Sequence, residues 1–272
     1  MTAQLRIVPY THHDDPTVTT SGASVVSGFE ATNTQNTLRG RTLRSASTSG
    51  FVLKGTLPAT RSATSLALFR HTAHGGDVQL ELFSDAAWSS SVYDSTALSA
   101  DCFTPDGTFD FGFPSGFTLA RPTPYVHWFE ETDFQSYEIT FSSTPTAAYW
   151  EVCRVILGKA FEFRVNPDYG ATIGWEDNTD SGRTMGGSQR TNNGEKWKTG
   201  VLDCNTIEED ERQAVIDIIE RMGLANDGLL SLFGEDGTTM EAAYTFNFKF
   251  KNLGTLGRQI ARLQKRFEIQ EQ

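Results

Sequence analysis

The sequence predicts a mainly β protein with two β-rich domains and a single amphipathic helix in the second. Many segments of strand length alternate apolar and polar residues, and turn residues separate them. One segment, 206–222, has helical periodicity instead. The 272 residues, 38% hydrophobic and 21% charged, are enough for one large or two ordinary domains with real cores. A β-sandwich, followed by a second β-rich domain that carries the helix, is therefore expected.

The first half is interpreted as a β-sandwich of short strands. Val78, Leu80 and Leu82 alternate with polar residues, so one face of that strand is apolar. The turn residues 74–77 stand between two strong strand segments, which predicts a β-hairpin. Segment 84–117 is rich in Gly, Pro, Ser and Asp and is expected to be mostly loop. The strands expected in this half are a short one within 1–20, then 23–29, 50–57, 65–70, 78–84, 125–130 and 135–142.

A domain boundary is expected at Ser-Ser-Thr-Pro, residues 142–145. It gives a sandwich over 1–145 and a second β-rich domain over 146–272. In the second domain, 244–251 has the clearest alternation, with four aromatic residues on one face and polar residues on the other. The tail, 257–272, is a strand or a second helix, and a strand is favoured. The other strands expected here are 152–157, 161–165, 196–203 and 229–233.

The segment 206–222 has the signals of a complete helix. Thr206 is the expected N-cap and Glu209 stands three residues later, the spacing of a capping box. Gly223 suits a left-handed C-terminal cap, and Leu224 is expected to fold back on Ile219. The apolar stripe, which we expect to pack on a sheet, consists of Val215, Ile218, Ile219 and Met222.

A long segment, 166–194, is rich in Gly, Asn, Asp and Thr and cannot build a core of its own. Its bulky apolar residues are Ile173, Trp175 and Met185. Its length predicts either an ordered functional arm or one mobile hairpin.

Charge and cysteine content exclude several classes of protein. The formal net charge is −11, with 8 basic and 14 acidic residues up to Pro145 and 15 and 20 after it, so neither half is a basic module for nucleic acid. Cys102, Cys153 and Cys204 form no CxxC motif, so we expect reduced thiols and no zinc site. The sequence predicts no signal peptide and no membrane insertion, since no apolar run approaches about 18 residues.

Candidate metal motifs are weak. The His71–His74 pair lacks the Glu and the i, i+4 spacing of a zincin helix, so both His are expected to be solvated. The run 12–15, His-His-Asp-Asp, has ligand chemistry but is interpreted as a solvated linker. The run 177–182 differs from a calcium loop at its third position and lacks the late Glu, so a turn is expected. We therefore expect no metal and no cofactor.

No catalytic constellation is visible, so we do not expect an enzyme. There is no Gly-x-Ser-x-Gly elbow and no P-loop ending. Trp88, Tyr93, Trp128 and Trp150 are candidates for stacking on sugar rings, Trp88 and Trp128 foremost, although core or hairpin packing is the usual role of isolated aromatics. The one basic cluster, Arg39, Arg41 and Arg44, either meets an acidic neighbour or is simply solvated.

The order of several segments and their amino-acid sequences resemble tail proteins of tailed bacteriophages. In the first half the resemblance lies in 38–45 (LRGRTLRS), 65–71 (SLALFRH) and 78–84 (VQLELFS). In the second half it lies in 149–159 (YWEVCRVILGK), then 166–170 (NPDYG), a glycine-rich arm, and a strand, helix and strand.

This resemblance implies a structural component of the tail tip: a distal tail, hub or minor tail protein made in the host cytoplasm and located in the virion tail. It implies that 146–272 is a ring-forming, β-barrel-like domain similar to the tail tube, and that 1–145 is a peripheral sandwich similar to a carbohydrate-binding module. The ring is expected to be a hexamer around a lumen through which DNA passes as cargo. The other partners implied are tail-tube and tail-tip proteins, with support of host attachment. In well-known distal tail proteins the ring domain comes first, whereas here the helix-bearing half comes last.

In such a ring, the arm is expected to cross to the next subunit. Trp175 or Met185 would anchor it, and Arg183 and Arg190 would meet an acidic surface. The alternative hypothesis is a soluble carbohydrate-binding, lectin-like sandwich that contacts a cell-surface glycan. A third, a glycan-cleaving tail enzyme, would need two carboxylates at catalytic separation.

Overall fold

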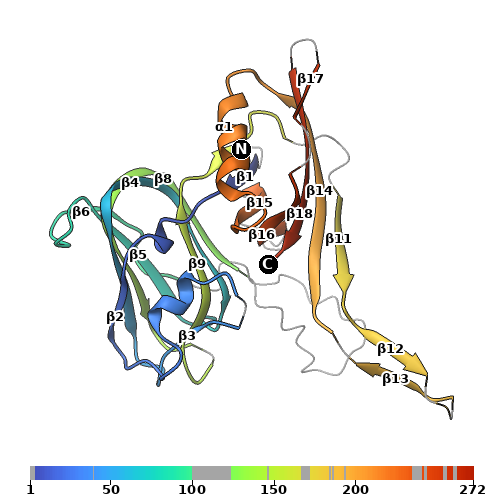
Figure 1. Cartoon of the computed structure of the whole chain (residues 1–272). Helices are drawn as coiled ribbons and strands as arrows, with labels where there is room; N and C mark the ends of the chain where they lie inside the picture. The colour runs from blue at the N-terminus through green and yellow to red at the C-terminus, as the bar shows by residue number, and fades with distance from the viewer. Residues whose placement is uncertain are drawn as a thin grey trace. The chain divides into compact units, whose positions relative to one another are not determined.

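The computed structural model describes residues 4–38, 40–99, 124–145, 147–166, 172–183, 185, 187–192, 194–234, 241, 244–253, 256–259 and 262–272. The protein is mainly β, as predicted, and the described part contains one α-helix (Figure 1). The described strand pairs are antiparallel. The chain forms two compact units: Met1–Glu162 with Gly228–Asn247, and Phe163–Asp227 with Phe248–Gln272.

This division differs from the boundary predicted at residue 145. The strand β9 (Glu151–Gly158) pairs with β4 (Phe51–His71), so it completes the sheet of the first unit. The strand β15 (Gly228–Gly234) returns to the first unit and pairs with β1 (Gln4–Val8). Pairing between segments far apart in sequence therefore decides which residues belong together.

The first unit contains an antiparallel sheet around two long strands, β4 and β8 (Tyr125–Ser142). Its strand order is β3 (Leu43–Arg44), β9, β4, β8, β5 (Asp77–Phe83) and β6 (Ser91–Asp94). Two further strands join it, β2 (Val18–Gly22) on β4 and β7 (Leu98–Ser99) on β5.

The sandwich arises because β4 and β8 contribute to both of its layers. Their register shifts between Thr56 and Arg61 and again between Ala63 and Ser65. Pro58 lies in the first irregular stretch, where a missing ladder N–H is tolerated. Both strands curve strongly in Figure 1. One buried cluster joins the two halves of these strands with their neighbours, including Leu53, Leu66, Leu80, Ile139 and Val155.

Two sequence expectations for this unit are wrong. Strand β8 lies between β4 and β5, so the turn at 74–77 links two strands that do not pair, and there is no hairpin. Segment 23–29 forms only an isolated bridge, Val25 to Ser45, instead of a strand. The pairs 50–57 with 65–70, and 125–130 with 135–142, are each one continuous strand.

The rest of the first unit packs on the other side of β4, β8 and β9. Strand β1 pairs with β10 (Phe161–Glu162) and with β15. A second buried cluster contains Val8, Ala67, Phe69, Val126, Ile156 and Leu229. Two short 3-10 helices, η1 (His12–Asp14) and η2 (Ala31–Gln35), connect the early strands.

The second unit is an open antiparallel sheet. Strand β16 (Thr245–Asn252) pairs with β18 (Arg262–Glu271), then come β14 (Lys196–Ile207) and β11 (Thr172–Asp177). Strand β17 (Leu256–Gln259) pairs with β18. Among the described strands this sheet does not close on itself, so the predicted barrel-like domain is wrong. The strand favoured for the tail is confirmed as β18.

Strand β16 shows its predicted alternation only in part. Phe248 and Phe250 are buried while Lys249 is half-buried. The Phe250 ring stacks on Phe267 at 5.5 Å between centroids. Thr245 and Asn247, which were expected on a polar face, are buried as well. This end of the strand is covered on both faces.

The helix α1 spans Arg212–Met222, six residues shorter at its start than predicted. Thr206 lies in β14 and is not the N-cap, because the β14–β18 ladder extends to Ile207. The Glu211 carboxylate instead accepts from the Glu208 N–H at 3.0 Å. Leu224 is 55% exposed, so it does not make the expected apolar cap contact. The stripe is confirmed by the burial of Val215, Ile218 and Met222.

Candidate functional site

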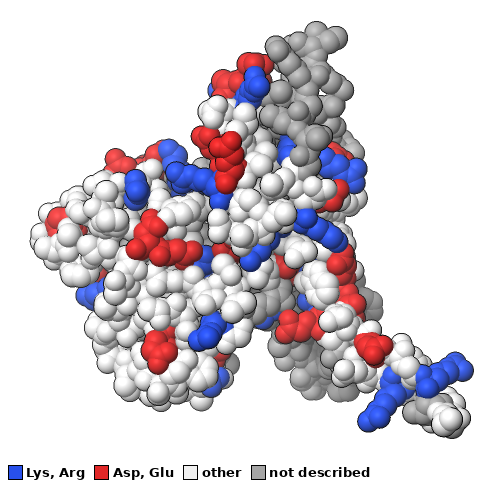
Figure 2. All heavy atoms as spheres, viewed as in Figure 1, with Lys and Arg blue, Asp and Glu red and all other residues white. Residues whose placement is uncertain are grey.

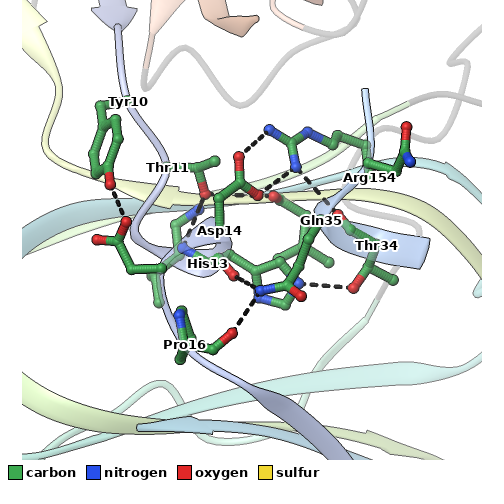
Figure 3. A network of polar contacts seen from close by, with 12 residues as sticks. Tyr10, Thr11, His13, Asp14, Pro16, Thr34, Gln35 and Arg154 are labelled. Atoms are coloured by element: carbon green, nitrogen blue, oxygen red, sulfur yellow. Dashed lines mark hydrogen bonds and ion pairs between the residues drawn. The ribbon is translucent and has the colours of Figure 1, made fainter. Parts of the chain in front are cut away.

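The most extensive polar network in the first unit is buried and centred on His13 (Figure 3). Its Nδ1 lies 2.6 Å from the hydroxyl of Tyr137 on β8, and its Nε2 lies 2.7 Å from Thr34 Oγ1 on η2. His13 and Tyr137 are fully buried. The expectation that residues 12–15 form a solvated linker is therefore wrong for its histidines, since His12 is buried too.

The hydrogen bonds fix the tautomer of His13. The Thr34 hydroxyl donates to the carbonyl of Ala31 at 2.6 Å, so Thr34 Oγ1 accepts from the His13 Nε2–H. Nδ1 then carries no proton and accepts from the Tyr137 hydroxyl. Burial, and secondarily the positive charge of Arg154, lower the pKa of His13 to about 3. Burial, with the nearby Asp14 and Asp15 charges, raises the pKa of Tyr137 well above its usual value.

The same network fastens the N-terminal segment to the sandwich. Arg154 on β9 donates through Nη1 and Nη2 to the two carboxylate oxygens of Asp14, at 2.6 and 2.7 Å. Gln35 Nε2 donates to the carbonyls of His13 and Pro16 at 2.7 and 2.8 Å. These groups satisfy one another inside the fold, so we interpret the network as a structural clamp and look for a binding site on the surface.

Three strands of the sandwich turn a polar face outward, with β6 beside them. The core-facing residues Leu53, Leu80, Leu82, Tyr137 and Ile139 are buried, and the alternating residues between them are not. The register aligns Lys54 with Glu138, Glu138 with Glu81, and Glu81 with Asp94 across four strands. We call this surface the outer face and define it by Lys54, Gln79, Glu81, Asp94, Glu138 and Thr140.

Several contacts organise the outer face. Lys54 forms an ion pair with Glu138, and both side chains are partly exposed. Gln79 Nε2 donates to Asp94 Oδ1 at 2.7 Å. Glu81 lies between the carboxylates of Glu138 and Asp94, an arrangement of like charges that costs folding energy across a sheet. The outer face thus offers carboxylate, amide, ammonium and hydroxyl groups to a ligand.

Trp88 lies beside the outer face, in the turn between β5 and β6. Its side chain is 37% exposed, and Lys54 Nζ lies 5.6 Å from the centroid of its ring. Its φ of +54° is rare for a bulky residue. The Asp85 carboxylate holds the turn by accepting from Ala87 N–H at 2.8 Å and from Ser89 N–H at 3.1 Å. Hydrogen bonds from Ser89 and Ala87 lower the pKa of Asp85 to about 2, which keeps it ionised as an acceptor.

Trp128, the other candidate for sugar stacking, is engaged within the first unit. The guanidinium of Arg6 lies 4.7 Å from the centroid of its ring, and its Nε1–H donates to Glu241 Oε1 at 2.6 Å. Arg6 also forms an ion pair with Glu162 on β10. We therefore build the candidate site on Trp88 rather than on Trp128.

A second group of aromatic rings contains one of the sequence candidates, Tyr93, and two residues that sequence reasoning missed, His127 and Phe129. Tyr93 on β6 stacks on Phe129 on β8 at 4.7 Å, and its hydroxyl lies 2.6 Å from His127 Nε2. Burial lowers the pKa of His127 and raises that of Tyr93. All three rings are half-buried, and Tyr93 and Phe129 pack against the sandwich core. His127 and Phe129 are two residues apart on β8, so strand alternation puts them on the same face. Their contact with Tyr93 on β6 joins segments far apart in sequence, and no pattern of neighbouring residues predicts it.

The predicted arm is an ordered hairpin in its described part. Strand β11 carries Trp175, which is 60% exposed, and β12 (Asp180–Arg183) pairs with β13 (Gln189–Asn192). Met185, between these two strands, is fully exposed. Arg183 and Arg190 lie on the hairpin and are exposed. Trp175 on β11 thus lies in the strand before the hairpin that carries the other three candidate contact residues.

The remaining sequence motifs take structural roles or lie outside the described residues. Arg44 pairs with Glu151 at 2.8 Å and lies 3.9 Å from the Tyr149 ring centroid, so it is not simply solvated. Arg39 and Cys102 lie outside the described residues. His71 is buried and its ring lies 4.9 Å from that of His74, so the expectation of solvation is wrong for His71. Asp177 Oδ1 accepts from Thr179 N–H at 2.8 Å, the turn expected there.

The described residues contain no group of three or more His, Cys, Asp or Glu side chains placed to hold a metal ion. Within the same residues, no helix combines the length and the apolar composition needed to cross a membrane.

Comparison with known proteins gives distant structural likenesses only. No family model matches the chain, and no curated protein matches it. Chitosan-binding module 1 of a chitosanase/glucanase from Paenibacillus sp. IK-5 is similar at a TM-score of 0.39 and 13% identity, over 54% of this chain and 98% of that one. The family 32 carbohydrate-binding module of C. perfringens NanJ, in complex with galactose, is similar at a TM-score of 0.38 and 9% identity, over 58% of this chain and 99% of that one. The lectin domain of lectinolysin, complexed with Lewis B antigen, is similar at a TM-score of 0.37 and 9% identity, over 54% of this chain and 95% of that one.

Proposed function

We propose that the sandwich of the first unit is a carbohydrate-binding module and that its binding site is the outer face beside Trp88. The observation that carries this proposal is the half-exposed indole of Trp88, held at a positive φ next to Lys54. A backbone strained in this way persists only when the surrounding structure maintains it, and such residues are frequent at ligand sites. Here the Asp85 hydrogen bonds maintain it.

The chemistry of the surface suits a sugar ring. A pyranose has apolar C–H faces and a rim of hydroxyl groups, so it can lie flat on an aromatic ring while polar neighbours bond its rim. The outer face supplies acceptors in Glu81, Asp94 and Glu138 and donors in Lys54 and Gln79. Because these residues lie on strands, their spacing is fixed before a ligand arrives, which lowers the entropic cost of binding.

A glycan array followed by calorimetry tests this proposal. The parent protein should bind a defined set of glycans, and Trp88→Ala should weaken binding about tenfold or more, which corresponds to ~1.4 kcal/mol. Trp175→Ala is the matched control, since it removes an exposed tryptophan far along the sequence on β11. Glycan binding that is equal in the parent and in Trp88→Ala, or absent from the parent, would overturn the proposal.

The second proposal is a structural role in a bacteriophage tail tip, as the sequence resemblance implies, with no enzymatic activity. The observation that favours it is the hairpin β12–β13, whose residues are exposed and whose two strands pair only with each other among the described strands. Such a segment suits contact with neighbouring subunits or with tail-tube proteins. Single-particle images of the purified protein test this proposal: closed rings support it, and separate subunits at all concentrations oppose it.

A further inference from the structure

The hairpin β12–β13 has little internal stabilisation. All eight residues of its two strands are exposed, and the strands form a separate two-stranded sheet. The hairpin continues the β11–β14 ladder, since the Asn178 N–H donates to the Glu195 carbonyl at 3.1 Å between the two pairings. A two-stranded segment without a buried face is nevertheless at best marginally stable in water. Its ordered form is therefore better explained if a further surface packs on it.

The exposed apolar residues of the arm are concentrated on and near this hairpin. Trp175 and Met185 have the two largest exposed fractions among the large hydrophobic residues described, 60% and 110%. Trp175 belongs to β11, which pairs with β14 on one edge and with no described strand on the other. An open strand edge with an exposed aromatic side chain is a template for pairing with another chain.

The charge of the hairpin points to the kind of partner. Arg183 and Arg190 occupy adjacent positions, since Arg190 is opposite Gly182 and Arg183 is opposite Gln189. Neither arginine forms an ion pair with a described residue. Figure 2 shows basic side chains over the hairpin and an acidic group beside them; β12 itself begins with Asp180. The chain as a whole carries a formal charge of −11, so a second copy offers the complementary sign.

We propose that β11 and the hairpin β12–β13 form a self-association surface whose occupant is a second copy of this chain. Trp175 and Met185 supply the apolar contact, and Arg183 and Arg190 select an acidic surface of the neighbour. The inference deepens the second proposal above and does not depend on glycan binding by the outer face.

Sedimentation velocity of the full chain tests the inference. At protein concentrations up to about 0.1 mM, where an interface of micromolar Kd is saturated, the parent should sediment as an oligomer. Trp175→Lys should give monomers, because a lysine at the open edge opposes strand pairing. Arg183→Glu/Arg190→Glu should also give monomers, and high salt should weaken association of the parent.

Matched controls separate this surface from general changes in charge or folding. Arg41→Glu/Arg61→Glu makes the same charge change at exposed arginines outside the arm and should leave the oligomer intact. Circular dichroism should be the same in all variants. Trp88→Ala should assemble like the parent, and Trp175→Lys should bind glycans like the parent, so the two proposals fail separately. A parent that is monomeric throughout, or arm variants that assemble like the parent, would overturn the inference.

Discussion

Nδ1 of His13 lies 2.6 Å from the Tyr137 hydroxyl although 124 residues separate the two in sequence. The contact joins η1 to the middle of the sandwich and uses the imidazole in its neutral form. A proton on Nδ1 would face the Tyr137 O–H donor and place a second cation near Arg154. The clamp that holds the N-terminal segment is therefore coupled to the protonation of one side chain.

We predict that the free energy of unfolding decreases as the pH falls from about 6.5 toward 3. In that window the unfolded state binds a proton at residue 13 and the folded state does not, so stability rises with pH by up to about 1.4 kcal/mol per unit. Urea unfolding of the parent and of His13→Asn at several pH values measures this. The variant should have a shallower slope; equal slopes would show that His13 is not buried in its neutral form.

Asp14→Asn should destabilise the protein, because it removes the carboxylate that accepts two hydrogen bonds from the buried Arg154 guanidinium. The loss concerns only the two hydrogen bonds that Asp14 accepts, because Arg154 keeps other contacts such as its bond to the Thr34 carbonyl. Arg154 is 3% exposed and Asp14 is 34% exposed, so we expect a loss of about 1–3 kcal/mol. Glu131→Gln is the control: it breaks the Lys159 pair, in which both side chains are about half exposed, and should cost under ~1 kcal/mol. Similar unfolding free energies for both variants would contradict the prediction.

Gly76→Ala should be destabilising for a steric reason. A Cβ at Gly76 would lie 2.3 Å from Cη2 of Trp150, a fully buried side chain whose Nε1–H donates to the Thr48 carbonyl. Moving that ring disturbs the core, and we expect a loss of about 1–3 kcal/mol. Gly40→Ala meets no atom within 4 Å and should be nearly neutral. Thermal unfolding measures both variants, and the melting temperature should fall for Gly76→Ala only. Equal melting temperatures would contradict the steric argument.

Phe248→Ala should cost roughly 3–5 kcal/mol, because the ring is fully buried and packs edge-on against Phe250. Lys249→Ala, one residue along β16, removes a half-buried polar side chain and should be close to neutral. Denaturant unfolding distinguishes the two. Comparable losses would mean that the two faces of the strand are not distinguished by burial.

Local patterns predicted the strands and the helix because they depend on neighbouring residues. The period-2 pattern located β5, β9 and β15, and the stripe of α1 is buried as expected. The order of strands could not be predicted in this way. Strand β8 separates β4 from β5 through pairings between residues far apart in sequence, and no local signal encodes them.

The polar sites were harder to predict for the same reason. His12 and His13 have the sequence context of a solvated linker, yet Thr34, Tyr137 and Arg154 surround and satisfy this segment. Trp88 and Trp128 were equivalent as isolated aromatic residues. Only the structure shows that Arg6 and Glu241 engage Trp128 while Trp88 stays half-exposed.

The discontinuous composition of the two units bears on how the chain is made. Strand β1 leaves the ribosome before its partner β15, which follows only after most of the second unit has been synthesised. Because domains generally fold as units during synthesis, the first unit stays incomplete until Asn247 has emerged. When the chain has emerged only as far as Glu162, β1 can pair with β10 but not with β15, so one edge of β1 is open to pairing with other chains.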